Sequence, residues 1–245
     1  MSKSTVYLIT GGNRGIGQHI GLILAQRENV TVITTSRKPT NTGIAAHPTS
    51  RHIELLLDES DESISSSTLA QRLRNTHSIN HLDVVIANAG ASSGFKPIPA
   101  TTPSDILHDF TVNTVGTVKL FQATWPLLDN SEIKKFVIVS SSVGSIASLG
   151  VESFPSTAYG MSKAAVNWFG KKLSVDYKEK GLVVGIVHPG WVKTPMGQLL
   201  ADAVDFPEPP MEVWDSAKAV VERIDNLTLE TSGKFLNFDG AEVPW

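Results

Sequence analysis

The sequence predicts an α/β fold in which a doubly wound sheet of seven parallel strands is flanked by helices. Short β-branched runs alternate with longer helix-like stretches, as right-handed crossovers between parallel strands require. Several runs are apolar at consecutive positions, which indicates strands covered on both faces. Glycine and proline concentrate after the strand ends, where open sheets of this class bind ligands.

The predicted strands follow the β-branched runs in chain order. They span Thr5–Thr10, Val30–Thr35, His52–Leu57, Asp83–Ala87, Lys135–Ser140, Leu182–His188 and Lys234–Phe238. The predicted helices lie near Gly15–Arg27, Glu62–Asn75, Pro103–Leu128, Ala158–Glu179 and Met211–Asn226. Because no repeat, low-complexity tract or linker interrupts this alternation, residues 1–245 are expected to form a single domain.

Composition excludes several classes of protein. The chain has 245 residues, 41% hydrophobic and 18% charged, which provides a core and argues against disorder. The 21 basic and 24 acidic residues give a net charge of −3 with no basic block, so nucleic-acid binding is not expected. Cysteine is absent, which rules out disulfides and thiol catalysis, and the seven histidines form no metal-binding cluster, so no metal is expected.

Targeting and membrane signals are also missing. The apolar run Val6–Ile9 is shorter than the roughly 7–15 apolar residues of a signal peptide. No stretch approaches the roughly 20 apolar residues that cross a bilayer. The sequence therefore predicts a cytoplasmic protein without membrane contact.

A glycine-rich turn, Thr10–Gly17, joins the first predicted strand to the first predicted helix. Its glycines suit a tight turn, close approach of the backbone to a pyrophosphate and close packing of helix on strand, while the helix N-terminus attracts an anion. This arrangement favours a Rossmann-type dinucleotide site over a plain turn. The expected contacts are Gly11, Asn13, Arg14, Gly15, Ile16 and Gly17.

The end of the second predicted strand indicates which dinucleotide is bound. An enzyme that prefers NAD usually carries an acid here to hold the ribose 2′-hydroxyl, but this sequence has Ser36 followed by Arg37. Arg37 and Arg14 together favour a 2′-phosphate, so NADP(H) is the expected cofactor; an ordinary solvated charge is the alternative for Arg37. Asp58 is placed to accept from the adenine amino group, or it is a loop acid.

Tyr159 and Lys163 stand four residues apart in the fourth predicted helix, which places both side chains on one face. With the glycine-rich turn, this pair makes the sequence resemble the short-chain dehydrogenase/reductase family. The motifs that carry the resemblance are Thr10–Gly17, Asn88-Ala89-Gly90, Asn113, Ser140–Ser142, Tyr159 with Lys163, and Pro189-Gly190 with Thr194. The ending, Ser232–Gly240 through Pro244-Trp245, is similar to sniffer-type carbonyl reductases and fungal norsolorinic-acid-type ketoreductases.

The resemblance implies hydride transfer between a nicotinamide and a carbonyl, with Tyr159 as general acid. A free phenol has a pKa near 10, so bringing the Tyr159 pKa to near 7 takes roughly 4 kcal/mol of differential stabilisation. The Lys163 ammonium, the oxidised nicotinamide and the helix N-terminus are the expected sources. The resemblance also implies that Lys163 binds the nicotinamide ribose and that Asn113 holds a water relaying protons from Lys163 to solvent.

Ser141 is expected to donate a hydrogen bond to the substrate oxygen. Ser141 lies 18 residues before Tyr159, farther than is usual in the family. We match the family's serine to Ser141 because Gly144 follows three residues later, which makes residues 145–156 an enlarged loop. Ser142 and Ser140 are the alternatives.

The remaining cofactor contacts lie after the fourth and sixth predicted strands. The resemblance implies that Asn88 and Gly90 lie beside the adenine ribose and stabilise the central sheet, although an ordinary turn explains Asn88 equally well. The nicotinamide loop is expected to comprise Pro189, Gly190, Val192 and Thr194. The backbone near Val192 and the Thr194 hydroxyl would contact the carboxamide.

Two apolar segments, near residues 142–157 and 196–211, are expected to form the substrate pocket, with Phe95 and Trp191 as aromatic walls. They favour an apolar, aromatic or polyketide-like carbonyl substrate. The leading hypothesis is therefore an NADPH-dependent carbonyl reductase. The alternatives are an NADP-dependent alcohol dehydrogenase working oxidatively and a non-catalytic NADP(H)-binding regulator. The resemblance also implies a homodimer or homotetramer, formed through the helices after the fourth and fifth strands.

Overall fold

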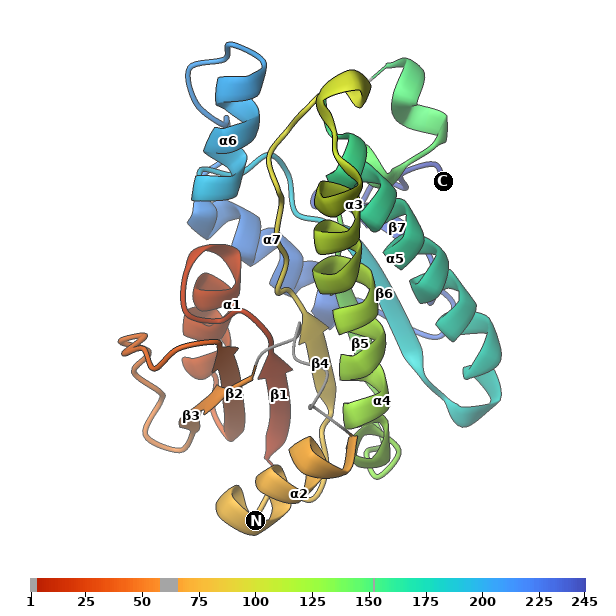
Figure 1. The fold of residues 1–245 in the computed structure, drawn as a ribbon. Coiled ribbons are helices and arrows are strands. Elements are labelled where there is room, and N and C mark those ends of the chain that lie inside the picture. Colours follow the sequence, from red (N-terminus) through yellow and green to blue (C-terminus); the bar gives the residue numbers. More distant parts are fainter. Residues whose placement is uncertain (1–3, 58–65, 152) are drawn as a thin grey trace.

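The computed structural model of the protein describes residues 4–57, 66–151 and 153–245. Within these residues, seven parallel strands form one sheet in the order β3-β2-β1-β4-β5-β6-β7 (Figure 1). The strands are β1 Thr5–Ile9, β2 Val30–Ser36, β3 Arg51–Leu56, β4 Val84–Ala87, β5 Lys135–Val139, β6 Val183–His188 and β7 Phe235–Asn237. The predicted fold class is confirmed.

Helices cover both faces of this sheet. They are α1 Gly15–Ala25, α2 Ser66–His77, α3 Pro103–Phe110, α4 Gly116–Leu128, α5 Thr157–Asp176, α6 Pro195–Ala203 and α7 Val213–Asp225. Buried side chains of α2, α4 and α5 pack on one face, and those of α1 and α7 pack on the other. The strand order reverses between β1 and β4, so the loops leaving these strands diverge and leave a crevice at their carboxyl ends.

Two helices differ from the sequence prediction. The single helix predicted over Pro103–Leu128 is divided by a π-helical turn, Thr111–Val115, which lies between α3 and α4. Helix α6 was not predicted, although Thr194 caps it and Pro195 occupies its first turn. The predicted start of α2, at Glu62, lies outside the described residues.

Helix α5 lies unusually close to its neighbours because two glycines leave no room for a side chain. A Cβ atom on Gly170 would come within 2.7 Å of Ile186 Cγ1 in β6. A Cβ atom on Gly144, in the loop after β5, would come within 2.7 Å of the backbone carbonyl carbon of Lys163. The helix is therefore fixed against both the sheet and the loop that leaves β5.

Candidate active site

The glycine-rich turn after β1 adopts a conformation that side chains would prevent. Gly11 and Gly15 have φ values of +65° and +57°, where residues with a Cβ atom are strained. A Cβ atom on Gly17 would come within 2.4 Å of the Asn88 side-chain nitrogen and 2.5 Å of the Gly11 carbonyl oxygen. The turn thus lies directly against the end of β4.

Helix α1 begins at this turn with its N-terminus open to a ligand. Arg14 is the N-cap residue, but its side chain does not cap the helix, and the first turn carries no acid. The first amide groups and the positive end of the helix dipole are therefore available to an anion. The predicted contacts Asn13, Gly15 and Ile16 are all partly accessible at this end, so the residues present fit the pyrophosphate of a dinucleotide.

Asn88 joins the ends of β1 and β4. Its side-chain amide donates to the carbonyl oxygens of Thr10 (2.9 Å) and Gly11 (3.3 Å), while its backbone N–H donates to the Thr10 hydroxyl (3.1 Å). Asn88 therefore holds the glycine-rich turn in place, which is the sheet-steadying role that the resemblance implied; contact with the adenine ribose remains a prediction. A Cβ atom on Gly90 would lie 3.3 Å from the Asn113 side-chain oxygen, so this glycine lets the loop after β4 pack closely on Asn113.

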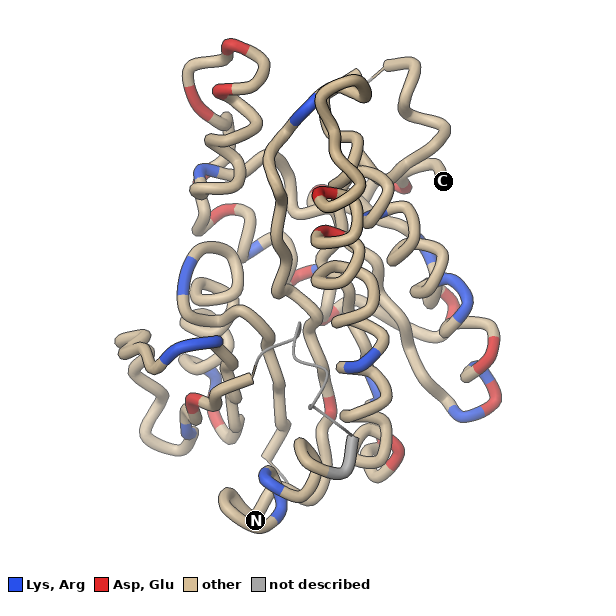
Figure 2. The backbone as a smooth tube through the Cα atoms, viewed as in Figure 1, with Lys and Arg blue, Asp and Glu red and all other residues tan. Residues whose placement is uncertain are grey.

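Arg14 lies in the turn that opens α1, and Arg37 directly follows β2. Figure 2 shows basic residues in blue on both of these segments. Both are exposed, and neither guanidinium has a hydrogen bond or ion pair within the described part of the chain. Two free guanidiniums beside the glycine-rich turn fit an additional phosphate. Asp58, the predicted adenine contact, lies outside the described residues.

Tyr159 and Lys163 face the same way from the first turns of α5. Both are buried, with 9% and 4% of their surface exposed, and the Lys163 ammonium lies 5.5 Å from the centre of the Tyr159 ring. The ammonium donates to the backbone carbonyl of Val139 at the end of β5 (3.0 Å). The Phe95 ring packs edge-on against Tyr159 at 5.7 Å between centroids.

Burial controls the ionisation of this pair. It lowers the pKa of Lys163 from 10.5 to about 8, so the amine is still mostly protonated at pH 7. It also raises the pKa of Tyr159, an effect that the negative charge of Asp109 reinforces and a hydrogen bond with the Ser141 side chain opposes. The sequence analysis expected a lowered Tyr159 pKa. In the protein alone the direction is opposite, because removal of the phenol from water outweighs the other interactions.

The three serines after β5 point to different partners. The Ser140 hydroxyl donates to the Asn167 side chain inside the core, and the Ser142 backbone N–H donates to Nδ1 of His188 (3.2 Å). Among these three serines, Ser141 is the one whose side chain acts on the Tyr159 phenol, where it opposes the rise in pKa. This interaction favours Ser141 as the candidate that would share a substrate oxygen with Tyr159.

Asn113 lies in the π-helical turn and has only 1% of its surface exposed. Its side-chain nitrogen donates to the carbonyl of Ala91 and to the Ser162 hydroxyl (both 2.9 Å), and its side-chain oxygen accepts from the Ala91 N–H (2.8 Å). The side chain thus ties the loop after β4 to α5. The water-relay role that the resemblance implies for Asn113 remains a prediction. π-Helical turns are frequent at functional sites.

Asp109, one turn before Asn113, was missed by the sequence analysis. Its side chain is fully buried, and one carboxylate oxygen accepts from the Ser93 backbone and hydroxyl (both 2.8 Å). The other oxygen has no partner among the described residues. An acid inside an apolar helix pattern was the available signal, and the structure places its charge where it acts on Tyr159.

The predicted nicotinamide loop follows β6. Gly190 has a φ of +91°, and a Cβ atom there would come within 2.4 Å of the Met211 sulfur. The Pro189 carbonyl accepts from the buried Ser216 hydroxyl (2.7 Å), and Val192 pairs with Met211. These contacts tie the loop to the segment that follows α6.

Thr194 has a role that the sequence analysis did not foresee. Its hydroxyl accepts from the Gly197 N–H (3.1 Å) and lies 3.3 Å from the Val192 carbonyl, so it caps α6. The Thr194 hydroxyl would have to contact the nicotinamide carboxamide while it also caps α6, and this contact remains a prediction. Beside it, the Lys193 ammonium pairs with Glu208 (2.8 Å) and Glu212 (2.7 Å), which fastens the segment after α6 at its middle and at its end.

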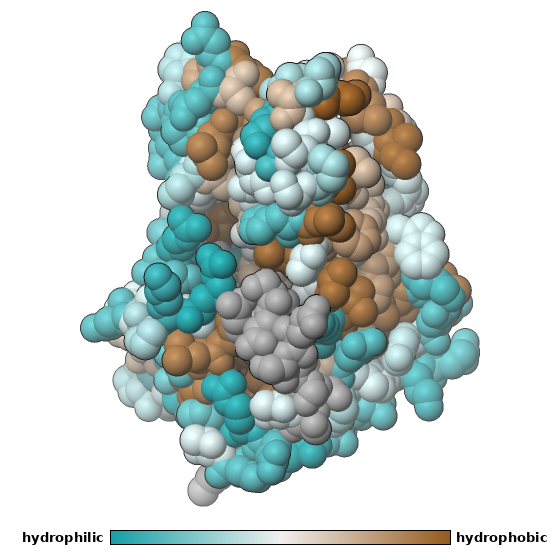
Figure 3. Space-filling view, viewed as in Figure 1, coloured by the Kyte–Doolittle hydropathy of each residue, from teal (hydrophilic) through white to brown (hydrophobic). Residues whose placement is uncertain are grey.

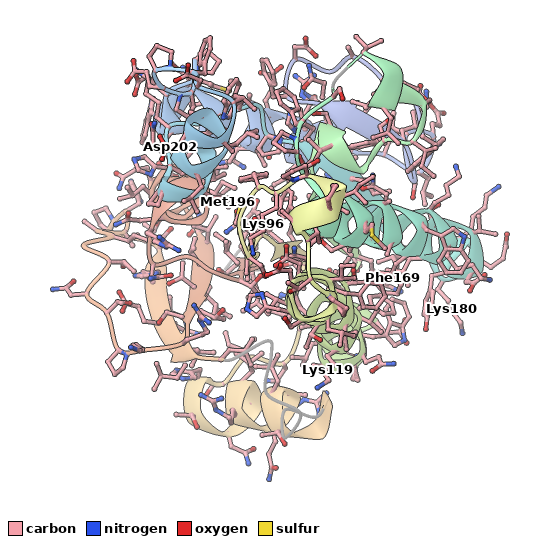
Figure 4. The ribbon with its side chains drawn as sticks, turned by 45° about the horizontal axis from the view of Figure 1, so that its top comes forward. Lys96, Lys119, Phe169, Lys180, Met196 and Asp202 are labelled. Carbon is pink, nitrogen blue, oxygen red and sulfur yellow. The ribbon has the colours of Figure 1, made fainter. Side chains whose placement is uncertain are left out.

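The two predicted substrate segments meet through aromatic rings. Trp191 packs against Phe154 of the first segment (5.9 Å between centroids) and against Phe206 of the second (5.2 Å). Viewed from above, Lys96 and Met196 lie near the centre of the molecule, and Asp202 lies on the outer part of α6 (Figure 4). Apolar surface is interspersed with polar surface over these upper segments (Figure 3).

Within residues 4–57, 66–151 and 153–245, no group of three or more His, Asp or Glu side chains could hold a metal ion. None of the helices in these ranges combines the length and apolar character needed to cross a membrane.

Comparisons with known proteins agree with this geometry. The family model for short chain dehydrogenases matches residues 5–205. A norsolorinic acid ketoreductase from Aspergillus parasiticus is 35% identical over 99% of this chain and 92% of its own length. An NADPH-bound carbonyl reductase from chicken fatty liver covers 99% of this chain and all of its own with 28% identity and a TM-score of 0.84. Carbonyl reductase Sniffer of Drosophila melanogaster gives the same coverage with 26% identity and a TM-score of 0.82.

Replacing Lys163 with Met should alter how stability depends on pH. The folded chain carries a cost of about 3 kcal/mol for burying the ammonium while the lysine is protonated in both states. The cost is fully present below the folded pKa of about 8 and disappears as pH rises toward the unfolded value of 10.5. Wild type should therefore gain stability relative to Lys163→Met between pH 8 and 10, as measured by urea unfolding.

Lys172→Met is the matched control, because Lys172 lies on the exposed side of the same helix. Its stability difference from wild type should not follow this trend. A Lys163→Met difference that stays constant across the range would contradict the burial effect.

Proposed function

The chain belongs to the short-chain dehydrogenase family, and on that premise we propose that it is an NADPH-dependent carbonyl reductase that converts a ketone or aldehyde to an alcohol. As a member of this family it is an oxidoreductase with a Rossmann-type sheet. The observation that carries the finer proposal is the meeting of Tyr159, Ser141 and Lys163 at the carboxyl edge of the sheet, beside the glycine-rich turn.

Tyr159 has the properties of an acid in the reductive direction. When bound, NADPH would supply the hydride for the carbonyl carbon. Because burial keeps the phenol protonated, Tyr159 holds its proton until negative charge develops on the substrate oxygen. Ser141 donates a second hydrogen bond to the same oxygen. Protonated Lys163 stabilises the resulting phenolate from a single turn away, and it can pass a proton onward as its own pKa is only about 8.

The preference for NADP(H) rests on charge at the adenosine end of the site. Arg14 and Arg37 are exposed and unpaired in the described chain, and β2 ends at Ser36 rather than at an acid. The chicken carbonyl reductase with the same fold is described as NADPH-bound. A carbonyl substrate with an aromatic or polyketide-like body is supported by the rings of Phe95, Trp191 and Phe206.

Two alternatives differ from this proposal in what they require of the site. Oxidation by the same residues, as in an alcohol dehydrogenase, would start from an ionised Tyr159, whereas burial and Asp109 keep the phenol protonated in the protein alone. A non-catalytic NADP(H)-binding regulator needs no buried Tyr159–Lys163 pair. Both observations support the reductase.

Replacing Tyr159 with Phe should remove the proton donor without disturbing the dinucleotide site. We expect reductase turnover to fall by about 10²–10⁴-fold, measured by loss of NADPH absorbance with aromatic ketones and quinones. NADPH binding, measured by fluorescence titration, should persist. Tyr177→Phe is the matched control, because Tyr177 packs on Trp125 and Phe121 away from the site. Unchanged turnover in Tyr159→Phe would sink the assignment.

Replacing Arg14 and Arg37 together with Ala should weaken NADPH selectively. Each lost charge-assisted bond to a phosphate is worth about 1.5–3 kcal/mol, so KM for NADPH should rise by at least about tenfold while KM for NADH changes little. Lys38→Ala tests whether any cation in this exposed loop has the same effect. A wild-type preference for NADH would show that both arginines were misinterpreted.

A homodimer or homotetramer is supported by apolar side chains on the outer face of α5. Met161, Trp168 and Val175 recur every seven residues and are 52%, 66% and 63% exposed. Hydrophobic atoms also gather on the neighbouring flank over α3 and α4 (Figure 3), where Leu107 is 66% exposed.

Light scattering of the purified protein should therefore give a mass that is a multiple of 26.4 kDa. Trp168→Lys should shift the measured mass toward that of the monomer. A monomeric wild type would refute this interface.

A further inference from the structure

The last two residues of the sequence lie against the enlarged loop that follows Ser141. In Figure 1 the C-terminus lies beside the green segment between β5 and α5. The Ser145 hydroxyl donates to the Pro244 carbonyl (2.6 Å), and the Ala147 backbone N–H donates to the Trp245 carbonyl (2.8 Å). Two hydrogen bonds thus join this loop to a segment about a hundred residues away in the chain.

The Pro244–Trp245 segment is itself firmly anchored. After β7 the chain turns back, and the Val243 N–H donates to the Phe235 carbonyl (2.8 Å). The Trp245 ring stacks on Phe235, with centroids 5.8 Å apart and planes 30° apart, and Phe235 is completely buried. On the other side, the Lys171 ammonium lies 5.9 Å from the ring centre. The ring therefore links β7 and α5 to the loop.

The loop end of this contact leads directly to the proposed site. Ser145 has 1% of its surface exposed and also accepts from the Ser148 N–H (3.1 Å), so it fixes the turn between residues 142–144 and 147–150. Gly144, one residue earlier, packs against the backbone of Lys163. Beyond the turn, Leu149 and Val151 are exposed and Phe154 packs on Trp191. The bonds to Pro244 and Trp245 therefore hold the loop at a point between the candidate Ser141 and the apolar residues of the loop.

We propose that Pro244 and Trp245 are positioning residues that clasp the 145–151 loop, and that this clasp sets how bulky substrates bind. The proposal rests on the proposed reductase function for its effect on substrates, but the contact itself does not. Without the clasp, residues 145–151 would lose their bonds to the body of the protein, while Ser141, Tyr159 and Lys163 keep their own contacts. Large substrates that touch the loop would then bind less well, and small ones would be little affected.

The first test measures the loop directly, without activity. Hydrogen exchange in wild type should protect the Ala147 amide, because it donates to Trp245. Trp245→Ala should speed exchange over 145–151 by about tenfold or more, with no change in β1 or β5. Trp245→Phe should restore protection by keeping an aromatic ring on Phe235. Ser145→Ala removes the bond to Pro244 from the other side and should act like Trp245→Ala. Glu242→Gln is the control, because Glu242 lies in the same hairpin and its carboxylate pairs with the exposed Lys234.

The second test measures substrates of two sizes with NADPH. In Trp245→Ala, KM for phenanthrenequinone should rise about tenfold with little change in kcat, whereas both constants for propanal and the Kd for NADPH should stay the same. Unchanged exchange at 145–151 in both Trp245→Ala and Ser145→Ala would overturn the clasp, as would faster exchange spread evenly through the sheet. Faster local exchange in a protein that reduces neither substrate would instead refute the proposed function and leave the clasp standing.

Discussion

Helix α5 packs closely on β5 and β6, where Gly170 faces the side chains of Ile138 and Ile186, and the proposed site depends on this close approach. Gly170 admits Ile186 on the sheet side, and Gly144 admits the backbone of Lys163 on the loop side. The approach brings the Lys163 ammonium within hydrogen-bonding distance of the Val139 carbonyl, at the very end of β5. A larger side chain at either glycine would separate the helix that carries Tyr159 from the strand end that carries Ser141.

The same approach excludes water from the two titratable groups. Burial disfavours the charged form of each, so it raises the pKa of Tyr159 and lowers that of Lys163. The site therefore holds a neutral phenol beside an amine that loses its proton more readily than a free lysine does. Asp109, whose carboxylate accepts from Ser93, adds a buried negative charge that also raises the pKa of Tyr159. In the protein alone the phenol is therefore held in the protonated form from which a proton donor starts.

The sequence predicted much of this arrangement, and the failures have identifiable physical causes. The strands were predictable because consecutive apolar residues mark strands buried on both faces, and the Tyr159–Lys163 pair was predictable because helical spacing fixes a common face. Apolar periodicity does not report one extra residue in a turn, so the π-helical turn at Asn113 was read as ordinary helix. The direction of the Tyr159 pKa depends on burial, which tertiary packing decides. The contact between Ser145 and Pro244 leaves no local signal in the chain.

The glycine-rich turn and the aromatic substrate segments come from different parts of the chain. Residues up to Asn88 build the glycine-rich turn and its support, whereas the aromatic rings of Phe154, Trp191 and Phe206 belong to loops that leave the second half of the sheet. These loops are fastened at their ends by surface ion pairs, a helix cap and the C-terminal clasp, not by strands. Outside the predicted nicotinamide loop, substitutions in these segments can therefore accumulate without disturbing the glycine-rich turn, so such a scaffold can acquire new specificities through changes in its loops while its chemistry stays the same.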